Sequence, residues 1–95
     1  MTKKQFDTYE LTKEKHFDKV CLFRVGSQCK AYGKDAVDVV DAVNHYMENN
    51  KLQVFYEFIG TEKKDIQTTG FDICDLDTYL PKILRCGYTV IISEL

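Results

Sequence analysis

The sequence has no tryptophan, one proline and five glycines among its 95 residues. So little proline and glycine excludes collagen-like and low-complexity chains, whose compositions are dominated by these residues. No apolar run approaches the roughly 20 residues that a membrane-spanning helix needs, and no apolar stretch follows the lysines at the N-terminus. We therefore expect a cytoplasmic protein that makes no contact with a membrane.

Cysteine and histidine are too scattered to indicate a metal site. The four cysteines include no CxxC pair, and the two histidines, His16 and His45, lie far apart. Zinc sites built from Cys and His need such ligands at short spacing, so the sequence predicts no metal. Most of the cysteines lie in apolar or helical patterns, which favours buried thiols in a reducing compartment over disulfides.

Sequence motifs of enzymes are also missing. There is no GxSxG, no HExxH and no glycine-rich phosphate loop, and the spacing of Gly26 and Gly33 does not fit a dinucleotide-binding turn. Nucleophilic catalysis needs a nucleophile beside a base and an orienting group, and neither histidine stands in such a pattern. We predict that the chain is not an enzyme and uses no cofactor.

Length and composition fit one globular domain over residues 1–95, because 44% of the residues are hydrophobic. The net charge of −2 gives no overall attraction to nucleic acid. Residues 1–34, however, hold eight Lys or Arg against four Asp or Glu, whereas residues 35–95 hold five against eleven. This distribution indicates a basic face next to an acidic body.

Two segments in the first half have the apolar spacing of helices. Residues 2–15 place Phe6 and Tyr9 at helical spacing behind Thr2, a typical N-cap. Residues 33–49 have the strongest pattern, since alanine and valine recur there every three or four residues.

A third helix is predicted to end at Arg85 and to begin at an N-cap, either Asp75 or Asp77. Capping explains these acids and nearby Asp72 better than cation binding, because the alternating ligands and closing glutamate of a calcium loop are absent. Such a start would place Pro81 near the first turn, where proline is tolerated.

Apolar or alternating runs predict the strands, at residues 20–25, 52–59, 67–72 and 88–93. Residues 28–32 fit either a strand or a loop. The last run is nearly all apolar and indicates a strand covered on both faces. Because helices and strands alternate, the predicted fold is α/β (α+β), with a central mixed sheet flanked by about three helices.

Two segments also have a recognisable order and spacing. The first is Leu22-Phe23-Arg24-Val25-Gly26, followed by Gly33 and then Asp35-Ala36 at the start of a helix. The second runs from Gly70-Phe71 through Leu76, Tyr79-Leu80, Lys82, Leu84 and Gly87 to residues 90–94. Together they resemble the start and the end of the N-terminal mismatch-recognition domain, domain I, of MutS DNA mismatch repair proteins. The resemblance covers nearly the whole chain and implies a mixed sheet with helices that touches the minor groove of mismatched DNA.

The chain departs from this family where recognition takes place. In the family a Phe-x-Glu motif follows the strand and its turn: the phenylalanine stacks on the mispaired base, and the glutamate hydrogen-bonds to it. The aligned positions here are Gln28 and Lys30. Glutamine supplies little of the roughly 1–3 kcal/mol of an aromatic–base stack, and lysine reverses the charge of glutamate. The resemblance therefore implies a divergent copy of the domain without mismatch recognition.

Two hypotheses remain open. In the first, the domain binds duplex DNA weakly, with an affinity that falls as salt rises. The candidate DNA-binding residues lie in the basic N-terminal third: Lys3, Lys4, Lys13, Gln28, Lys30 and Lys34. In the second, the chain has kept the fold and lost DNA binding, and it serves as an accessory module for an unknown protein partner. The lysines would then be an ordinary solvated surface.

Overall fold

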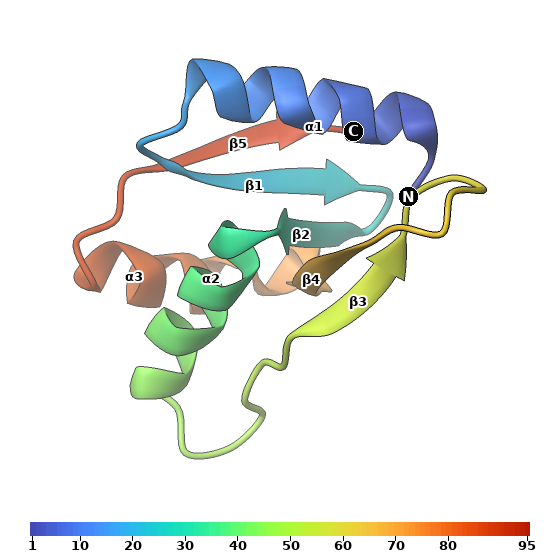
Figure 1. The fold of residues 1–95 in the computed structure, drawn as a ribbon. Helices are drawn as coiled ribbons and strands as arrows, with labels where there is room; N and C mark the ends of the chain where they lie inside the picture. The colour runs from blue at the N-terminus through green and yellow to red at the C-terminus, as the bar shows by residue number, and fades with distance from the viewer.

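The computed structural model describes residues 1–95. Its elements, in chain order, are α1 (Lys3–Lys15), β1 (Val20–Val25), β2 (Gln28–Tyr32), α2 (Lys34–His45), β3 (Phe55–Phe58), β4 (Asp65–Asp72), the 3-10 turn η1 (Ile73–Asp75), α3 (Leu76–Arg85) and β5 (Val90–Glu94). The strands form one mixed sheet in the order β3-β4-β2-β1-β5, in which only β1 and β5 run parallel. Figure 1 shows α1 on one face of the sheet and α2 and α3 on the other. The predicted fold class, a mixed sheet with about three helices, is confirmed.

Alternation of side chains along β1 divides the core into two layers. Val20 and Leu22 belong to the larger cluster, which lies under α2 and α3 and also holds Cys29, Ala31, Val39, Val43, Phe71 and Ile83. Cys21 and Phe23 point the other way and join Tyr32 under α1. Residues 20–23 are all buried, so β1 is the buried strand that the apolar run predicted.

The first helix starts where the sequence predicts. The Thr2 hydroxyl accepts the N–H of Gln5, and the Gln5 side chain accepts the N–H of Thr2, which completes a capping box. No residue of α1 is fully buried. Its main anchor is Tyr9, whose ring packs edge-on against Phe23 and Tyr32 at centroid distances of 5.6 and 5.5 Å.

The second helix and the strand after it are shorter than predicted. Helix α2 ends at His45 rather than near Asn49, and β3 begins at Phe55 rather than at Leu52. The reason is a tertiary contact: the Asn44 amide donates to the carbonyl of Leu52 and accepts its N–H, both at 2.8 Å. These two bonds hold the chain close to Asn44 after the helix ends. They also occupy the backbone N–H and C=O of Leu52, so that Leu52 does not pair with β4.

The start of α3 agrees with the prediction in its N-cap position, Asp75, but not in the capping bond or in the place of Pro81. Asp75 occupies the N-cap position but makes no side-chain capping bond, and Asp77 lies inside the helix. Instead, the Asp72 carboxylate accepts the N–H of Cys74 at 2.9 Å and caps η1. Because α3 begins at Leu76, Pro81 lies in the second turn, where it removes one helical hydrogen bond.

The prediction that the last strand is covered on both faces is wrong. Strand β5 is an edge strand that pairs only with β1, and the Ile92 side chain is exposed. The ambiguous residues 28–32 form a strand between β1 and β4. None of the helices has the length and apolar character needed to span a membrane.

Candidate nucleic-acid interface

The six residues predicted to contact DNA lie in two groups, near opposite ends of α1. Lys3 and Lys4 are in its first turn, and Lys30 reaches the same region, since its partner Glu57 also binds the N-terminal amine. Gln28 is on the same face of β2 as Lys30. Lys13 and Lys34 instead line a cavity at the other end of the helix.

Lys30 crosses a neighbouring strand in order to reach its partner. Its register partner on β4 is Gly70, and the Lys30 Cγ lies 3.1 Å from where a Cβ of residue 70 would be. A side chain at that position would crowd the lysine and the Cys29 carbonyl, 3.0 Å away, and force one of them to shift by a few tenths of an ångström. Gly70 therefore leaves room for the Lys30 side chain to cross the sheet.

The amine of Lys30 forms an ion pair with Glu57 on β3. The Nζ to Oε1 distance is 2.7 Å, and the second carboxylate oxygen of Glu57 lies 3.1 Å from the N-terminal amine. Burial raises the pKa of Glu57, but the hydrogen bonds from Lys30 and the N-terminal amine outweigh it and hold this pKa below its usual value. The charge of Lys30 is thus compensated inside the molecule.

Lys3 and Lys4 are more open to solvent. Lys3 lies 3.5 Å from Asp7 and 3.9 Å from Glu62, but all three side chains are well exposed, and pairs of this kind contribute little free energy. Lys4 is exposed and makes no salt bridge. These two amines are therefore available to a ligand.

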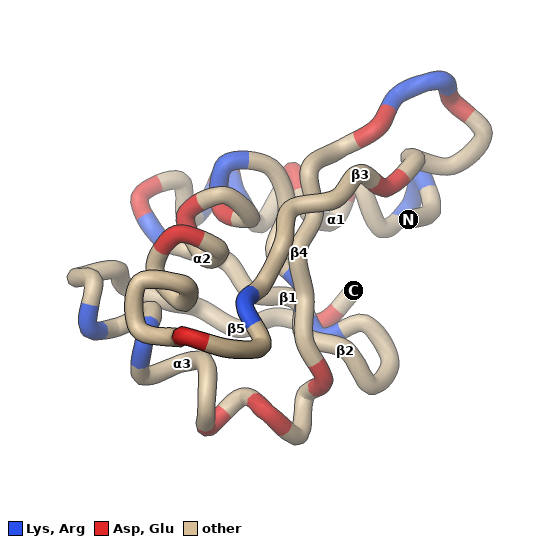
Figure 2. Tube along the Cα trace, turned by 90° about the horizontal axis from the view of Figure 1, so that it is seen from below, with Lys and Arg blue, Asp and Glu red and all other residues tan.

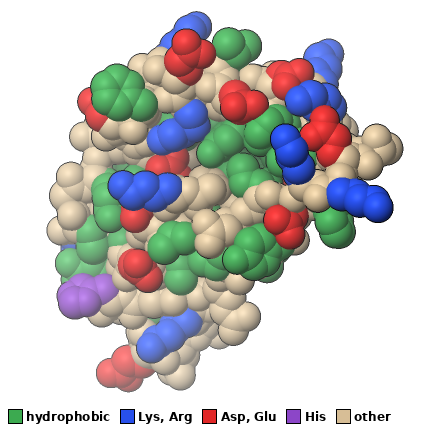
Figure 3. Space-filling view, in the orientation of Figure 1, with side chains coloured by type: hydrophobic (Ala, Val, Ile, Leu, Met, Phe, Trp, Pro, Cys, Tyr) green, Lys and Arg blue, Asp and Glu red, His purple; other side chains and the backbone are tan.

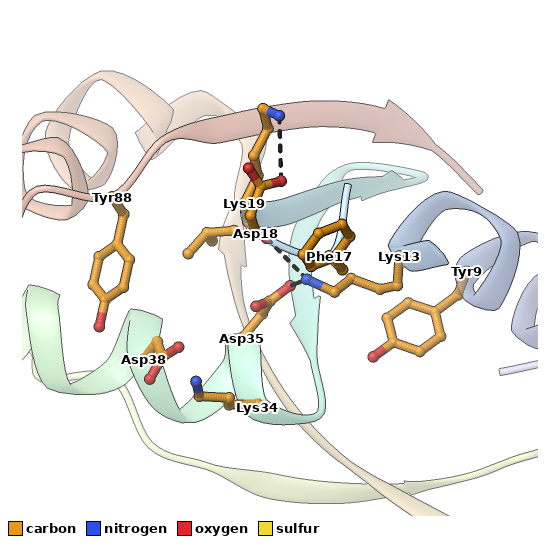
Figure 4. Close-up of a pocket in the computed structure, with 10 residues that line it drawn as sticks. Tyr9, Lys13, Phe17, Asp18, Lys19, Lys34, Asp35, Asp38 and Tyr88 are labelled. Carbon is orange, nitrogen blue, oxygen red and sulfur yellow. Dashed lines mark hydrogen bonds and ion pairs between the residues drawn. The ribbon is translucent and has the colours of Figure 1, made fainter. Parts of the chain in front are cut away.

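At the other end of α1, a cavity of about 280 Å³ contains a buried ion pair. The Nζ of Lys13 lies 2.9 Å from Oδ2 of Asp35, and the same oxygen accepts the N–H of Cys21 at 3.1 Å. Figure 4 shows Lys13 reaching from α1 to Asp35, whereas Lys34 and Asp38 are joined by no dashed line. Lys13 thus connects α1 to α2, and exposed Lys34 is the available amine here.

The other titratable groups have structural surroundings. His16 is the C-cap residue of α1, and His45 is the last residue of α2. Burial raises the pKa of Cys29 to about 11, which keeps that thiol protonated. No three His, Cys, Asp or Glu side chains are grouped so that they could hold a metal ion. The chemistry that the two ends of α1 offer is hydrogen bonding and ion pairing.

The fold and these surfaces define a class: an α+β domain in which a β-hairpin carries polar residues on one face of a five-stranded mixed sheet. The family model described as MutS domain I matches residues 4–95. The chain belongs to the MutS domain I family.

Curated relatives agree with this assignment. The chain is 33% identical over 91 residues to the DNA mismatch repair protein MutS of Phocaeicola vulgatus, an alignment that covers 96% of the chain and 9% of that protein. It is 33% identical over 86 residues to MutS of Christiangramia forsetii, covering 90% and 9%, and 30% identical over 105 residues to MutS of Fervidobacterium nodosum, covering 99% and 11%. The chain thus spans 9 to 11% of the length of these relatives.

Sequence reasoning named the two aligned positions, Gln28 and Lys30, but missed the partner of the second. Glu57 is the one charged residue in the strand Phe55–Phe58. A lone carboxylate among aromatic residues is a signal that could have indicated a buried partner. The identity of that partner depends on the register of three strands, which the pattern does not contain.

Proposed function

We propose that the chain is a non-catalytic, cytoplasmic MutS domain I module that contacts duplex DNA weakly and without the mismatch recognition of its family. The observation that carries the proposal is the state of the aligned recognition positions. Gln28 offers no ring to stack on a base, and Lys30 is engaged by Glu57 at 2.7 Å. Glutamine therefore stands in place of the family's phenylalanine wedge, and a lysine held in an internal ion pair stands in place of its glutamate.

The amines that support DNA contact are those that the fold leaves open. Lys4 and Lys34 are exposed and make no salt bridge, and Lys3 makes only exposed ones. Such amines neutralise phosphates and displace counterions, which gives binding that is independent of sequence and sensitive to salt. Lys13 and Lys30 contribute less, since each would have to leave a carboxylate.

A direct test compares a labelled homoduplex with the same duplex carrying one mismatch. Fluorescence anisotropy at low salt should give equal affinities for both, and both affinities should fall as salt rises. A clear preference for the mismatch would contradict the loss of recognition. Failure of both duplexes to bind at low salt would remove the DNA contact.

A gain-of-function variant tests the same positions. Lys30→Glu alone would leave two carboxylates facing each other without the lysine, so the variant combines Gln28→Phe, Lys30→Glu and Glu57→Gln, which removes the second negative charge. We expect a preference for mismatched over matched duplex, because one stacked ring provides about 1–3 kcal/mol. The matched control keeps the last two changes with Gln28→Ala and should show no preference. Equal behaviour of the two variants would mean that the docking surface itself has been lost.

The second candidate function is an accessory module that binds a protein. The observation that favours it is that two of the five candidate lysines are held in internal ion pairs, with Asp35 and Glu57. Affinity purification of the tagged chain, with and without nuclease, separates the two functions. A partner that survives nuclease treatment, together with no duplex binding at low salt, supports the accessory role.

A further inference from the structure

The edge strand β3 carries exposed aromatic side chains at three of its four positions. Tyr56 and Phe58 are 63% and 67% exposed, and Phe55 is 47% exposed. Burying rings of this size is one of the largest sources of binding free energy in proteins. Tyr56 and Phe58 alternate with Glu57 and therefore share one face of the sheet, where two such rings together are more than scattered surface residues and indicate a contact surface.

The position of β3 in the sheet explains the exposure. Residues 56 and 58 pair with Gln67 and Asp65 on β4 and share the face on which α2 packs. Helix α2 packs mainly over β1, β2 and β4, and the high exposure of the Tyr56 and Phe58 rings shows that this part of the sheet is uncovered. Their i, i+2 relation separates them by about 7 Å along the strand.

Basic residues stand at both ends of this strand. Lys51 lies in the loop that enters β3, and Lys63 and Lys64 lie in the hairpin that leaves it. All three are exposed and make no salt bridge. Figure 2 shows the Lys and Arg positions of the entering loop and the protruding hairpin on either side of β3. Of the nearby acids, Glu62 is paired with Lys3, and Asp65 is unpaired.

We propose that β3 is a binding surface for single-stranded nucleic acid, with Tyr56 and Phe58 as stacking platforms and Lys51, Lys63 and Lys64 as phosphate contacts. Rings on a flat sheet can stack only on unpaired bases, because the faces of bases in a duplex are already stacked. The flanking amines give the surface the charge that phosphates require. The two rings lie on the face of the sheet opposite α1, whereas the hairpin adjoins the first turn of α1, where Lys3 lies 3.9 Å from Glu62.

The experiment measures anisotropy of labelled oligo-dT of 20 nucleotides and of a 20-base-pair duplex, both at low salt. We expect oligo-dT to bind more tightly than the duplex. Tyr56→Ala and Phe58→Ala should each weaken oligo-dT binding about 5-fold or more, the lower end of the range for a base stack, and leave the duplex unaffected. Both side chains are exposed, so these variants should fold, which circular dichroism checks.

Two matched variants sharpen the result. Phe17→Ala removes another exposed ring, which is 81% exposed near the other end of α1, and should not change oligo-dT binding. Asp65→Asn removes the unpaired acid beside Phe58 and should tighten oligo-dT binding. An equal effect of Phe17→Ala, or no effect of the Tyr56 and Phe58 changes, would overturn the assignment.

The remaining outcomes distinguish a nucleic-acid surface on β3 from a protein contact and from the duplex contact. Sedimentation showing that copies associate through β3, with association lost in Tyr56→Ala and no oligo-dT binding, would make β3 a protein contact and overturn the proposal. Salt-sensitive duplex binding with no oligo-dT binding would overturn this proposal and leave the proposed function standing. Oligo-dT binding without duplex binding would support this surface and remove the duplex contact.

Discussion

Asp35 has a structural role that the family resemblance did not reveal. Its carboxylate is almost fully buried in the first turn of α2, accepts the N–H of Cys21 at the start of β1 and pairs with Lys13 of α1. One side chain therefore joins three elements that are distant in sequence. Its position also places a negative charge near the positive end of the helix dipole.

Replacing Asp35 should destabilise the fold. Asp35→Ala leaves the Cys21 N–H without an acceptor and the Lys13 amine with only the Lys19 carbonyl, and we expect a loss of about 3 kcal/mol in the free energy of unfolding. Asp35→Asn should lose less, because its amide oxygen can still accept the Cys21 N–H. Urea unfolding measures both, with Asp38→Ala as the control on the same helix. A loss below about 0.5 kcal/mol for Asp35→Ala would contradict the role.

The Lys30–Glu57 pair should make stability depend on pH. Because the pKa of Glu57 is lower in the folded than in the unfolded protein, its stabilisation is complete above the unfolded pKa and is lost as pH falls through the folded pKa. Glu57→Gln should cost about 1 kcal/mol at pH 7, and the difference from wild type should shrink below about pH 4. Urea unfolding at neutral and acidic pH measures this difference. A constant difference would show that the loss does not come from the charge.

At the level of single residues, the sequence indicated the aligned positions but not their environment. Gln28 and Lys30 follow a glycine turn with a fixed spacing, and local order is visible in sequence. The ion pair of Lys30 is not visible, since it needs β3 beside β4, β4 beside β2, and a glycine at position 70. Contacts that cross three strands depend on register, which apolar patterns do not encode.

Helix α1 is held to the sheet by few contacts, and Tyr9 provides the central one. Its ring meets Phe23 and Tyr32, while no residue of the helix is fully buried. Tyr9→Ala should therefore lower the free energy of unfolding by about 2–3 kcal/mol and increase hydrogen exchange throughout α1. Leu11→Ala, on an exposed side of the same helix, should change neither. Slow exchange in α1 of the Tyr9 variant would show that other contacts hold the helix.

The types of elements were predicted better than their ends. Each predicted helix and strand is present in the structure. These elements could be predicted because the apolar period that indicates each one is a local property of the chain. The end of α2 and the start of β3 depend instead on the bonds between Asn44 and Leu52, and the edge position of β5 depends on strand order. These are tertiary effects, so no window of sequence contains them.

Across the whole molecule, the uneven charge of the sequence does not form two separate faces. The three longest-range ion pairs of side chains join the basic N-terminal third to the acidic remainder: Lys3–Glu62, Lys13–Asp35 and Lys30–Glu57. Acidic and basic positions are interspersed along the trace in Figure 2, and both surround the hydrophobic side chains in Figure 3. Only the Lys13–Asp35 and Lys30–Glu57 pairs are largely buried, so the expected basic face is reduced to Lys3, Lys4 and Lys34.

This reduction sets the salt dependence of duplex binding. Each phosphate neutralised on B-DNA contributes about −0.9 to the slope of log K against log salt. Contacts by Lys3, Lys4 and Lys34 alone should give a slope near −2.7, whereas all five candidate lysines would give about −4.5. Anisotropy titrations of a homoduplex between about 25 and 200 mM salt distinguish these values.

Variants of the lysines test the same count. The double variant Lys4→Ala, Lys34→Ala should bring the slope to about −0.9. Lys13→Met should leave the slope unchanged, provided that the measurement is made where this less stable variant is folded. A wild-type slope near −4.5 would mean that DNA opens the pairs with Asp35 and Glu57, because binding must then release both amines from their carboxylates.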